Sequence, residues 1–423
     1  MGWLLIILLM VMVFGSVPVS FALTLTGLIF FLVHNIPLES FAQRMVEGVD
    51  SFPLLAAPFF ILAGNLMNAG GITRRIFNLA DSLVGHIRGG LGHVNVLASM
   101  LFAGMSGSAL ADAAGLGKVQ IEAMTDRGYD IEFSTAVTAG SATIGPIIPP
   151  SIIMVIYGIS AQVSIGNLFL GGIIPGVLMG LSLMLMVYFY SLINKYAVND
   201  GFKLSRVWHI LKECILALFT PIIIVGGILG GIFTPTESGA IAALYAFVIS
   251  FFVYKEVSLK QFGKILMETA SVTAVVLFIV TSASIYGWTL TFEQIPQAIA
   301  LQLVSVSTEP LIILLILSVL YLFLGALMEP SAIVIMTIPI VLPILNQFGI
   351  DPVFFGVLLA INMSVGTITP PVGITMFVLC KITGQSIDQY AKFIWPWLLL
   401  LILFMVLLMV FPEIVLFIPN LAN

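Results

Sequence analysis

A twelve-residue stretch that occurs twice constrains this chain more than any other feature. The first copy reads GSATIGPIIPPS over residues 140–151, and the second reads NMSVGTITPPVG over residues 362–373. Their Pro-Pro pairs are 221 residues apart, and the same offset relates other positions over about 70 residues: Gly104 to Gly325, Ser108 to Glu329 and Pro175 to Pro396. A constant offset over this length predicts that the chain contains two copies of one unit.

The composition sets the class of protein to which these copies belong. Of 423 residues, 60% are hydrophobic and 8% are charged, and the mean hydropathy is +1.18. Charged side chains are too few to cover a soluble globule of this size. Apolar runs recur at the length of roughly 20 residues that a helix needs to cross a bilayer. We therefore predict an all-α polytopic membrane protein.

Each copy is predicted to contain a re-entrant hairpin and a broken transmembrane helix. Residues 104–108 are small and poor helix formers, and charged residues return within about 20 residues, which is too short for two full spans. Residues 104–108 should therefore form a hairpin tip. Pro149 and Pro150 lack amide donors, so the next span should break between Gly145 and Pro150. In the second copy the same features predict a tip at 325–330 and a break at 366–371.

The charges indicate that the two copies have opposite orientations. Segment 69–90 contains three arginines and is predicted to be cytoplasmic. The equivalent segment 290–309 contains Glu293 and Glu309 and no lysine or arginine. We therefore expect inverted repeats. Inverted repeats with broken helices are typical of secondary transporters, which bind substrate and coupling ions where the breaks meet.

Free backbone groups at the breaks are candidate ion ligands, because such groups are costly in hydrocarbon unless they are paired or line a polar cavity. Carbonyl oxygens from Gly145 to Pro149, with the hydroxyls of Ser106 and Ser108, would form one oxygen cage for a hard cation. Residues 366–369, including Thr367, would form a second cage with Glu329. Half-helix N-termini at the same places suit an anionic substrate.

We expect the substrate between the two hairpin tips and the two breaks. The candidate binding residues are polar and lie at those places: Ser108, Ser141, Thr143, Ser151, Asn362 and Thr369, with Glu329 facing them from the second tip.

Structural alternatives apply to several of these residues. Small residues at 106–108 are also typical of close helix packing. Glu329 is an ionisable residue at predicted membrane depth and therefore a functional candidate, unless it lies at the outer interface. Asp112 can be a ligand, but the favoured interpretation is a cap on the hairpin arm. Glu237 is interpreted as part of a helix start in TPTES.

Sequence motifs of other function classes are absent. The chain has no GxxxxGK[ST] motif for ATP, no HExxH and no GxSxG elbow. An enzyme is not expected.

Five motifs together resemble the large membrane subunit, of the DctM type, of tripartite ATP-independent periplasmic (TRAP) transporters. They are FAGMSGSALADAAGLGKV (102–119), GSATIGPIIPPS (140–151), GIFTPTESGAIAALYA (231–246), LGALMEPSA (324–332) and VGTITPPVG (365–373). The resemblance extends over essentially the whole chain.

The resemblance implies a sodium-coupled importer of organic anions, such as sialic acid or C4-dicarboxylates, in the bacterial inner membrane. It implies a periplasmic binding protein of the DctP or SiaP type and a small four-helix membrane subunit of the DctQ or SiaQ type as partners. Membrane lipid surrounds such a complex, and no nucleic acid is expected. Two sodium sites are implied at residues of the hairpins and breaks: Ser106, Gly107, Ser108 and Gly145 for one, and Gly325, Glu329, Gly366 and Thr369 for the other.

The resemblance also implies an elevator motion, in which one part of the chain carries the site past another. We expect residues 91–160 and 310–380 to form the moving transport domain, and residues 1–90, 161–309 and 381–423 to form the scaffold. The alternatives are a sodium-coupled dicarboxylate carrier that works without a binding protein, a passive channel and a membrane scaffold without transport activity. A channel would need a continuous polar stripe through several spans, whereas the polar residues here form two clusters.

Overall fold

The computed structural model describes the chain except for Met1, Ser16, Ser51, Lys195, residues 197–200, Phe202 and Asn423. The described residues form helices and turns, without a strand. Seven of the described helices are long and apolar enough to cross a membrane. The prediction of an all-α membrane protein is confirmed.

The order of helices occurs twice. The first series is α5 (Ile72–Val84), α6 (Gly90–Ser106), α7 (Ala109–Asp112), a π-helical turn (Ala113–Gly117), α8 (Lys118–Asp126), α9 (Ile131–Ala142), α10 (Ile152–Ala161) and α11 (Ile165–Ile193). The second series is α15 (Ile295–Val306), α16 (Pro310–Leu327), α17 (Pro330–Gln347), α18 (Pro352–Thr367), α19 (Ile374–Thr383) and α20 (Ile387–Val410). Helices α7 and α17 begin 221 residues apart, as do α9 and α18.

The other helices precede, separate or follow the two series. They are α1 (Gly2–Phe14), α2 (Val19–Val33), α3 (Leu38–Glu47), α4 (Ala56–Ala69), α12 (Leu204–Leu229), α13 (Pro235–Val248), α14 (Leu259–Phe292) and α21 (Glu413–Ala422). The N-terminal apolar stretch 3–33 therefore forms two helices rather than one. Helix α3 contains no buried residue, as expected of an interfacial helix.

Both hairpins turn where the small residues and prolines predict. The first hairpin turns at Gly107, which has a φ of +62°, and Ser108. The second turns at Met328 and Glu329. The helix breaks lie between α9 and α10 and between α18 and α19, and each contains a cis Pro-Pro bond. A glycine with positive φ at the first tip is required because few other residues adopt this conformation.

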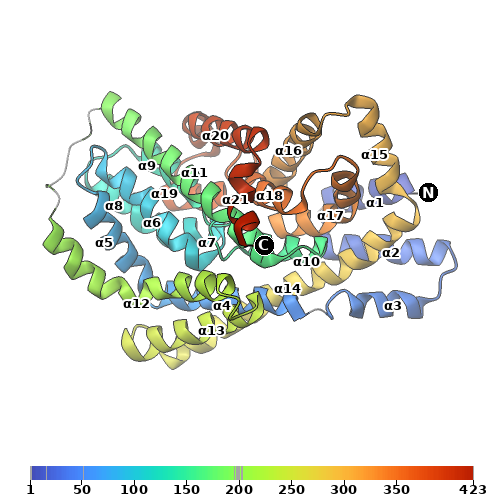
Figure 1. The fold of residues 1–423 in the computed structure, drawn as a ribbon, viewed down its shortest axis with the longest axis horizontal. Coiled ribbons are helices and arrows are strands. Elements are labelled where there is room, and N and C mark those ends of the chain that lie inside the picture. Colours follow the sequence, from blue (N-terminus) through green and yellow to red (C-terminus); the bar gives the residue numbers. More distant parts are fainter. Residues whose placement is uncertain are drawn as a thin grey trace.

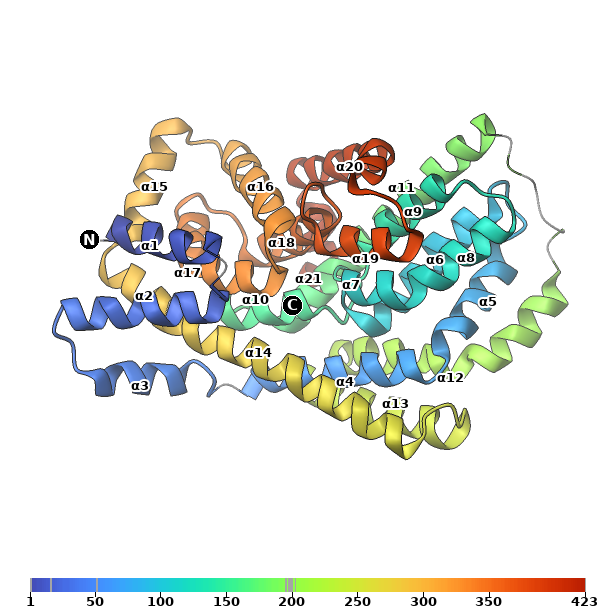
Figure 2. The same cartoon turned by 180° about the vertical axis from the view of Figure 1, so that it is seen from behind.

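The helices outside the hairpins and broken helices make two different sets of contacts. Helix α14 packs against α2 and α4, and α13 packs against α4 and α12. In both views α4, α13 and α14 run along one edge of the molecule (Figures 1 and 2). Helices α11 and α20 instead pack against members of the hairpins and broken helices, including α6, α9 and α18.

The two repeats interlock through their broken helices. Helix α10 of the first repeat packs against α17 of the second hairpin, and α19 of the second repeat packs against α7 and the π turn of the first hairpin. The hairpins themselves extend toward opposite ends of the molecule (Figure 2). The tips and breaks of both repeats consequently meet near the centre.

Candidate functional site

A cavity of about 590 Å³ lies where the tips and breaks meet. The hairpin tips contribute Gly107, Ser108 and Glu329 to its wall. The opposite wall is largely apolar and comes from α2, α4 and α14: Val19, Ile61, Val272, Val275, Val276 and Ile279. The cavity therefore lies between the hairpin tips and helices α2, α4 and α14.

The first hairpin places a carboxylate, Asp112, beside the first break. The side chain is 2% exposed. Ser106 Oγ donates a hydrogen bond to Asp112 Oδ1, whereas Oδ2 has no hydrogen-bond partner in the described structure. An alanine Cβ at Gly145 would lie 2.6 Å from Oδ2. The unpaired oxygen thus faces the bare backbone at Gly145.

The interpretation of Asp112 as a helix cap is wrong. Helix α7 is capped by Ser108, whose Oγ accepts a hydrogen bond from Ala111 N at 3.4 Å. A buried carboxylate oxygen without a partner is costly and requires an explanation. With Ser106 and the break at Gly145 beside it, the arrangement can hold a cation.

The second hairpin uses its carboxylate differently. Glu329 caps α17, and its Oε2 accepts a hydrogen bond from Ala332 N at 3.0 Å. Its Oε1 accepts a hydrogen bond from Ser331 Oγ at 2.9 Å. Glu329 is exposed and lines the same cavity as Ser108. Ser108 and Glu329, which the offset of 221 residues relates, therefore line one cavity.

Glycines bring the backbones of the site close together. An alanine Cβ at Gly366 would lie 2.7 Å from Gly325 Cα, so α16 and α18 cross in direct contact. A Cβ at Gly107 would lie 2.5 Å from the carbonyl oxygen of Pro150. These glycines therefore allow close packing of the backbone, which is the alternative to an ion-binding role given for residues 106–108.

The first break uses most of its side-chain hydroxyls internally. Ser141 donates a hydrogen bond to Asn95 Oδ1 at 2.7 Å, and Thr143 donates to Gly140 O at 2.6 Å. Ser151 caps α10 by accepting a hydrogen bond from Met154 N at 3.2 Å. None of these three predicted substrate residues lines the cavity.

The second break is more open to the cavity. Asn362 Nδ2 donates hydrogen bonds to Ser318 Oγ and Leu358 O, whereas its Oδ1 has no partner in the described structure. Thr369 donates to Val365 O. Neither residue lines the cavity. Thr367 does line it. So does Ser364, a residue that the sequence analysis did not single out. The only signal for Ser364 in the sequence is its position inside the repeated stretch.

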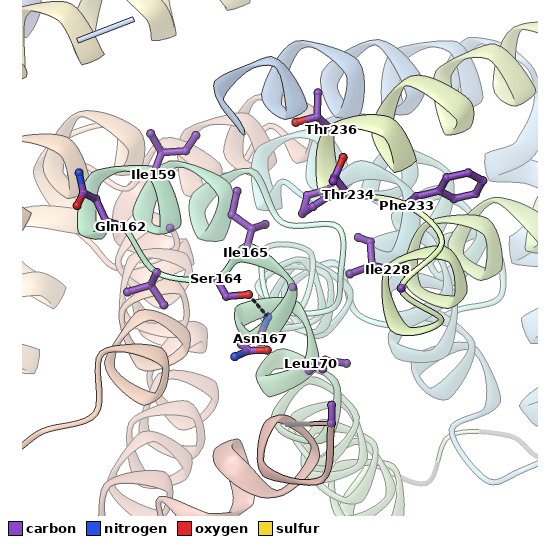
Figure 3. A pocket seen from close by; sticks show the side chains of 16 residues that line it. Ile159, Gln162, Ser164, Ile165, Asn167, Leu170, Ile228, Phe233, Thr234 and Thr236 are labelled. Carbon is purple, nitrogen blue, oxygen red and sulfur yellow. Dashed lines mark hydrogen bonds between the residues drawn. The ribbon is translucent and has the colours of Figure 1, made fainter. Parts of the chain in front are cut away.

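A second cavity, of about 830 Å³, lies between the α10–α11 and α12–α13 loops (Figure 3). Ser164 caps α11 by accepting a hydrogen bond from Asn167 N at 3.2 Å. Thr234 and Glu237 form a capping box at the start of α13, so the interpretation of TPTES as a helix start is confirmed. No charged side chain is among the described residues that line this cavity.

Comparison with known proteins identifies the family. Residues 6–414 match the family model described as "Tripartite ATP-independent periplasmic transporter, DctM component". The chain belongs to this family. The resemblance carried by the five motifs is thereby confirmed.

Several DctM-family proteins are similar over nearly their whole length. The sialic acid TRAP transporter large permease protein SiaM of Vibrio cholerae is 44% identical over 411 residues, which cover 97% of this chain and 96% of that protein. The C4-dicarboxylate TRAP transporter large permease protein DctM of Pseudomonas aeruginosa is 38% identical and covers 90% of both chains. The 2,3-diketo-L-gulonate TRAP transporter large permease protein YiaN of Escherichia coli is 37% identical, with coverages of 95% and 94%. These relatives are named as permeases rather than enzymes, and the three names give three different substrates.

A solved structure shares the fold. The YdaH transporter of Alcanivorax borkumensis matches with a TM-score of 0.64 and 15% identity, over 88% of each chain. At this identity the likeness concerns the fold alone.

Proposed function

We propose that this DctM-family chain is the large permease subunit of a sodium-coupled importer of an organic acid anion in the bacterial inner membrane. The observation that carries the proposal is the buried Asp112 carboxylate, whose unpaired oxygen faces the break at Gly145. It lies beside a cavity that both repeats build.

The chemistry of the first cage favours an alkali cation. Its available ligands are carboxylate, hydroxyl and backbone oxygens, which suit hard cations. Among the described residues no group of three or more His, Cys, Asp or Glu could hold a metal ion. We propose sodium at Asp112, Ser106 and Gly145, and a second sodium near Glu329, Gly325, Gly366, Thr367 and Thr369.

The charge balance of the cavity supports coupling between cation and anion. None of the described residues that line it is a lysine or arginine, and Glu329 contributes a negative charge. An anionic substrate would be repelled by Glu329 at short range. Sodium bound at the two cages would reduce this repulsion and favour the anion, which is the thermodynamic requirement for coupling.

The packing suggests how the transport domain is composed. We propose that the hairpins and broken helices of 91–160 and 310–380 move together with α11 and α20, which pack against them. Helices α2, α4, α12, α13 and α14 would then form the stationary wall, and the cavity would slide along α14. This proposal enlarges the transport domain predicted from the sequence, because α11 and α20 contact the broken helices more extensively than they contact α12 or α14.

The family supports a proposal for the partners of the transporter. We propose a small four-helix membrane subunit and a periplasmic binding protein that delivers the anion. The relatives' names give sialic acid, a C4-dicarboxylate and 2,3-diketo-L-gulonate as substrates, so the anion of this chain is to be identified by assay.

Uptake into proteoliposomes tests the proposal. The chain and its small subunit are reconstituted, and uptake of radiolabelled N-acetylneuraminate and succinate is measured with and without an inward sodium gradient and the binding protein. We expect uptake that requires both. Uptake without the binding protein would support the carrier alternative, and uptake indifferent to sodium would overturn the coupling.

A further inference from the structure

We propose that the N-terminus of α19 and the hydroxyl of Ser364 form the subsite that binds the carboxylate of the substrate. This inference rests on the proposed function, because it assumes that an organic anion enters the central cavity. Ile374, the first residue of α19, and Ser364 both line that cavity.

The N-terminus of α19 lacks a side-chain cap. Its N-cap residue is Gly373, and no side chain accepts a hydrogen bond from the first amides of this ten-residue helix. Amides at the start of a helix have no carbonyl partner within the helix, and they carry the positive end of the helix dipole. Such an end binds anionic oxygens readily.

The geometry prevents α19 from supplying its own cap. An alanine Cβ at Gly373 would lie 2.3 Å from Thr367 O and 2.9 Å from Thr369 O, both of them backbone atoms. Serine, threonine or aspartate at this position would therefore displace the backbone of the break. The end of the helix is held open by the packing around Gly373.

Ser364 adds a second free donor to the same cavity. Its side chain is 0% exposed, and its Oγ has no hydrogen-bond partner in the described structure. A helical hydroxyl ordinarily donates to a carbonyl one turn earlier, as Thr367 does to Ser364 O and Thr369 does to Val365 O. Ser364 keeps its donor available, and a buried unpaired hydroxyl is costly unless a ligand satisfies it.

The first repeat does not offer an equivalent subsite. Helix α10 is capped by Ser151, and Thr143, which corresponds to Ser364 at the offset of 221, donates to Gly140 O at 2.6 Å. No lysine or arginine is among the described cavity residues, so hydroxyl and amide donors must bind a carboxylate there. Ser108 also offers a hydroxyl, but only the second break combines a hydroxyl with an uncapped helix N-terminus.

Transport kinetics test the role of Ser364. The variants are Ser364→Ala, Ser364→Thr, which keeps the hydroxyl, and the control Ser182→Ala, which removes a helical hydroxyl that donates to Met179 O on α11. The probe is whichever of N-acetylneuraminate and succinate the wild type transports. We expect Ser364→Ala to raise the substrate KM roughly 10-fold without changing the sodium half-saturation concentration. Ser364→Thr and Ser182→Ala should stay close to the wild type. A change in sodium half-saturation with an unchanged KM would make Ser364 a cation ligand and overturn the proposal.

Cysteine labelling tests the subsite without transport. Ile374→Cys is placed at the first position of α19, and Phe377→Cys, at a side chain that is 42% exposed, is the control. Native Cys214 and Cys380 are buried. We expect N-acetylneuraminate or succinate, with sodium, to slow maleimide labelling of Ile374→Cys but not of Phe377→Cys. The protection should disappear when Ser364→Ala is added.

The outcomes separate the subsite from the proposed function. Equal labelling of Ile374→Cys with and without both anions would overturn the subsite. Protection of Ile374→Cys in a protein that shows no sodium-dependent uptake would retain the subsite and overturn the coupling.

Discussion

The two repeats share their helix order but leave different polar groups without hydrogen-bond partners at their helix breaks. In the first repeat α10 is capped by Ser151, and the group left without a partner is a carboxylate oxygen of Asp112. In the second repeat the Glu329 carboxylate has partners, while Ser364 and the N-terminus of α19 are left as free donors and Asn362 Oδ1 as a free acceptor. An unpaired carboxyl oxygen suits a cation, and unpaired donors suit an anion. A few side chains thus distinguish the two copies of one unit, and they support the proposal that the second copy also holds the carboxylate of the substrate.

The largest expected effect is at the unpaired carboxylate of the first repeat. Asp112→Ala should raise the sodium half-saturation concentration for uptake by about 30-fold or more, because the charged ligand of the cage is lost. Sodium-dependent uptake in proteoliposomes measures this change. Asp126→Ala, at an exposed position at the end of α8, is the control. An equal response of both variants would show that Asp112 is not a specific sodium ligand.

Gly366→Ala tests the backbone contact between α16 and α18 in the second repeat. The added Cβ would lie 2.7 Å from Gly325 Cα and force α16 and α18 apart. We expect a loss of stability of about 1–3 kcal/mol, seen as a lower melting temperature of the purified protein. Gly263→Ala, where no atom lies within 4 Å of the added Cβ, should be neutral or stabilising. A Gly366→Ala protein as stable as the wild type would show that this contact relaxes easily.

Ser151→Ala removes the cap that distinguishes α10 from α19. We expect a loss of about 1 kcal/mol of stability, the usual contribution of a serine N-cap, measured by thermal unfolding. The matched change at the other break, Val372→Ala, touches no cap and should cost less. If the two variants have the same melting temperature, the Ser151 cap does not stabilise α10, and the difference in capping between α10 and α19 has no effect on stability.

The smallest effect is expected at Glu329. Glu329→Gln keeps an acceptor for Ala332 N and removes only the charge. Glu329 is exposed and both of its oxygens already have partners. Exposed ionic interactions contribute about 1 kcal/mol or less, so the sodium half-saturation concentration should change by no more than about five-fold. Titration of uptake against sodium measures it. A loss as large as that of Asp112→Ala would mean that the two carboxylates act alike.

Much of the fold was predictable because its causes are local. Small residues at 104–108 end a helix, and consecutive prolines at 149–150 and 370–371 prevent one from continuing, so tips and breaks could be located from the sequence. Four predicted cage members from the two tips and the second break also line the cavity: Gly107, Ser108, Glu329 and Thr367.

The partners of individual side chains were less predictable. From the sequence, Asp112 and Ser108 are both reasonable N-caps for the second arm of the first hairpin. Only the structure shows that Ser108 is the N-cap and that Asp112 faces Gly145. Ser141 and Thr143 lie in the repeated stretch, yet they are used in bonds to Asn95 and Gly140. The proposed role of Ser364 in binding the substrate carboxylate depends on the absence of such an internal hydrogen bond.

The sequence by itself determined the membrane class, the duplication, the places where helices turn or break and the family, because composition, spacing and backbone chemistry are local properties. The tertiary structure alone decided which polar groups at those places remain free. Each hydroxyl or carboxylate can be satisfied by a neighbour that is distant in sequence, and only the packed arrangement of both repeats around the cavity shows which ones are not.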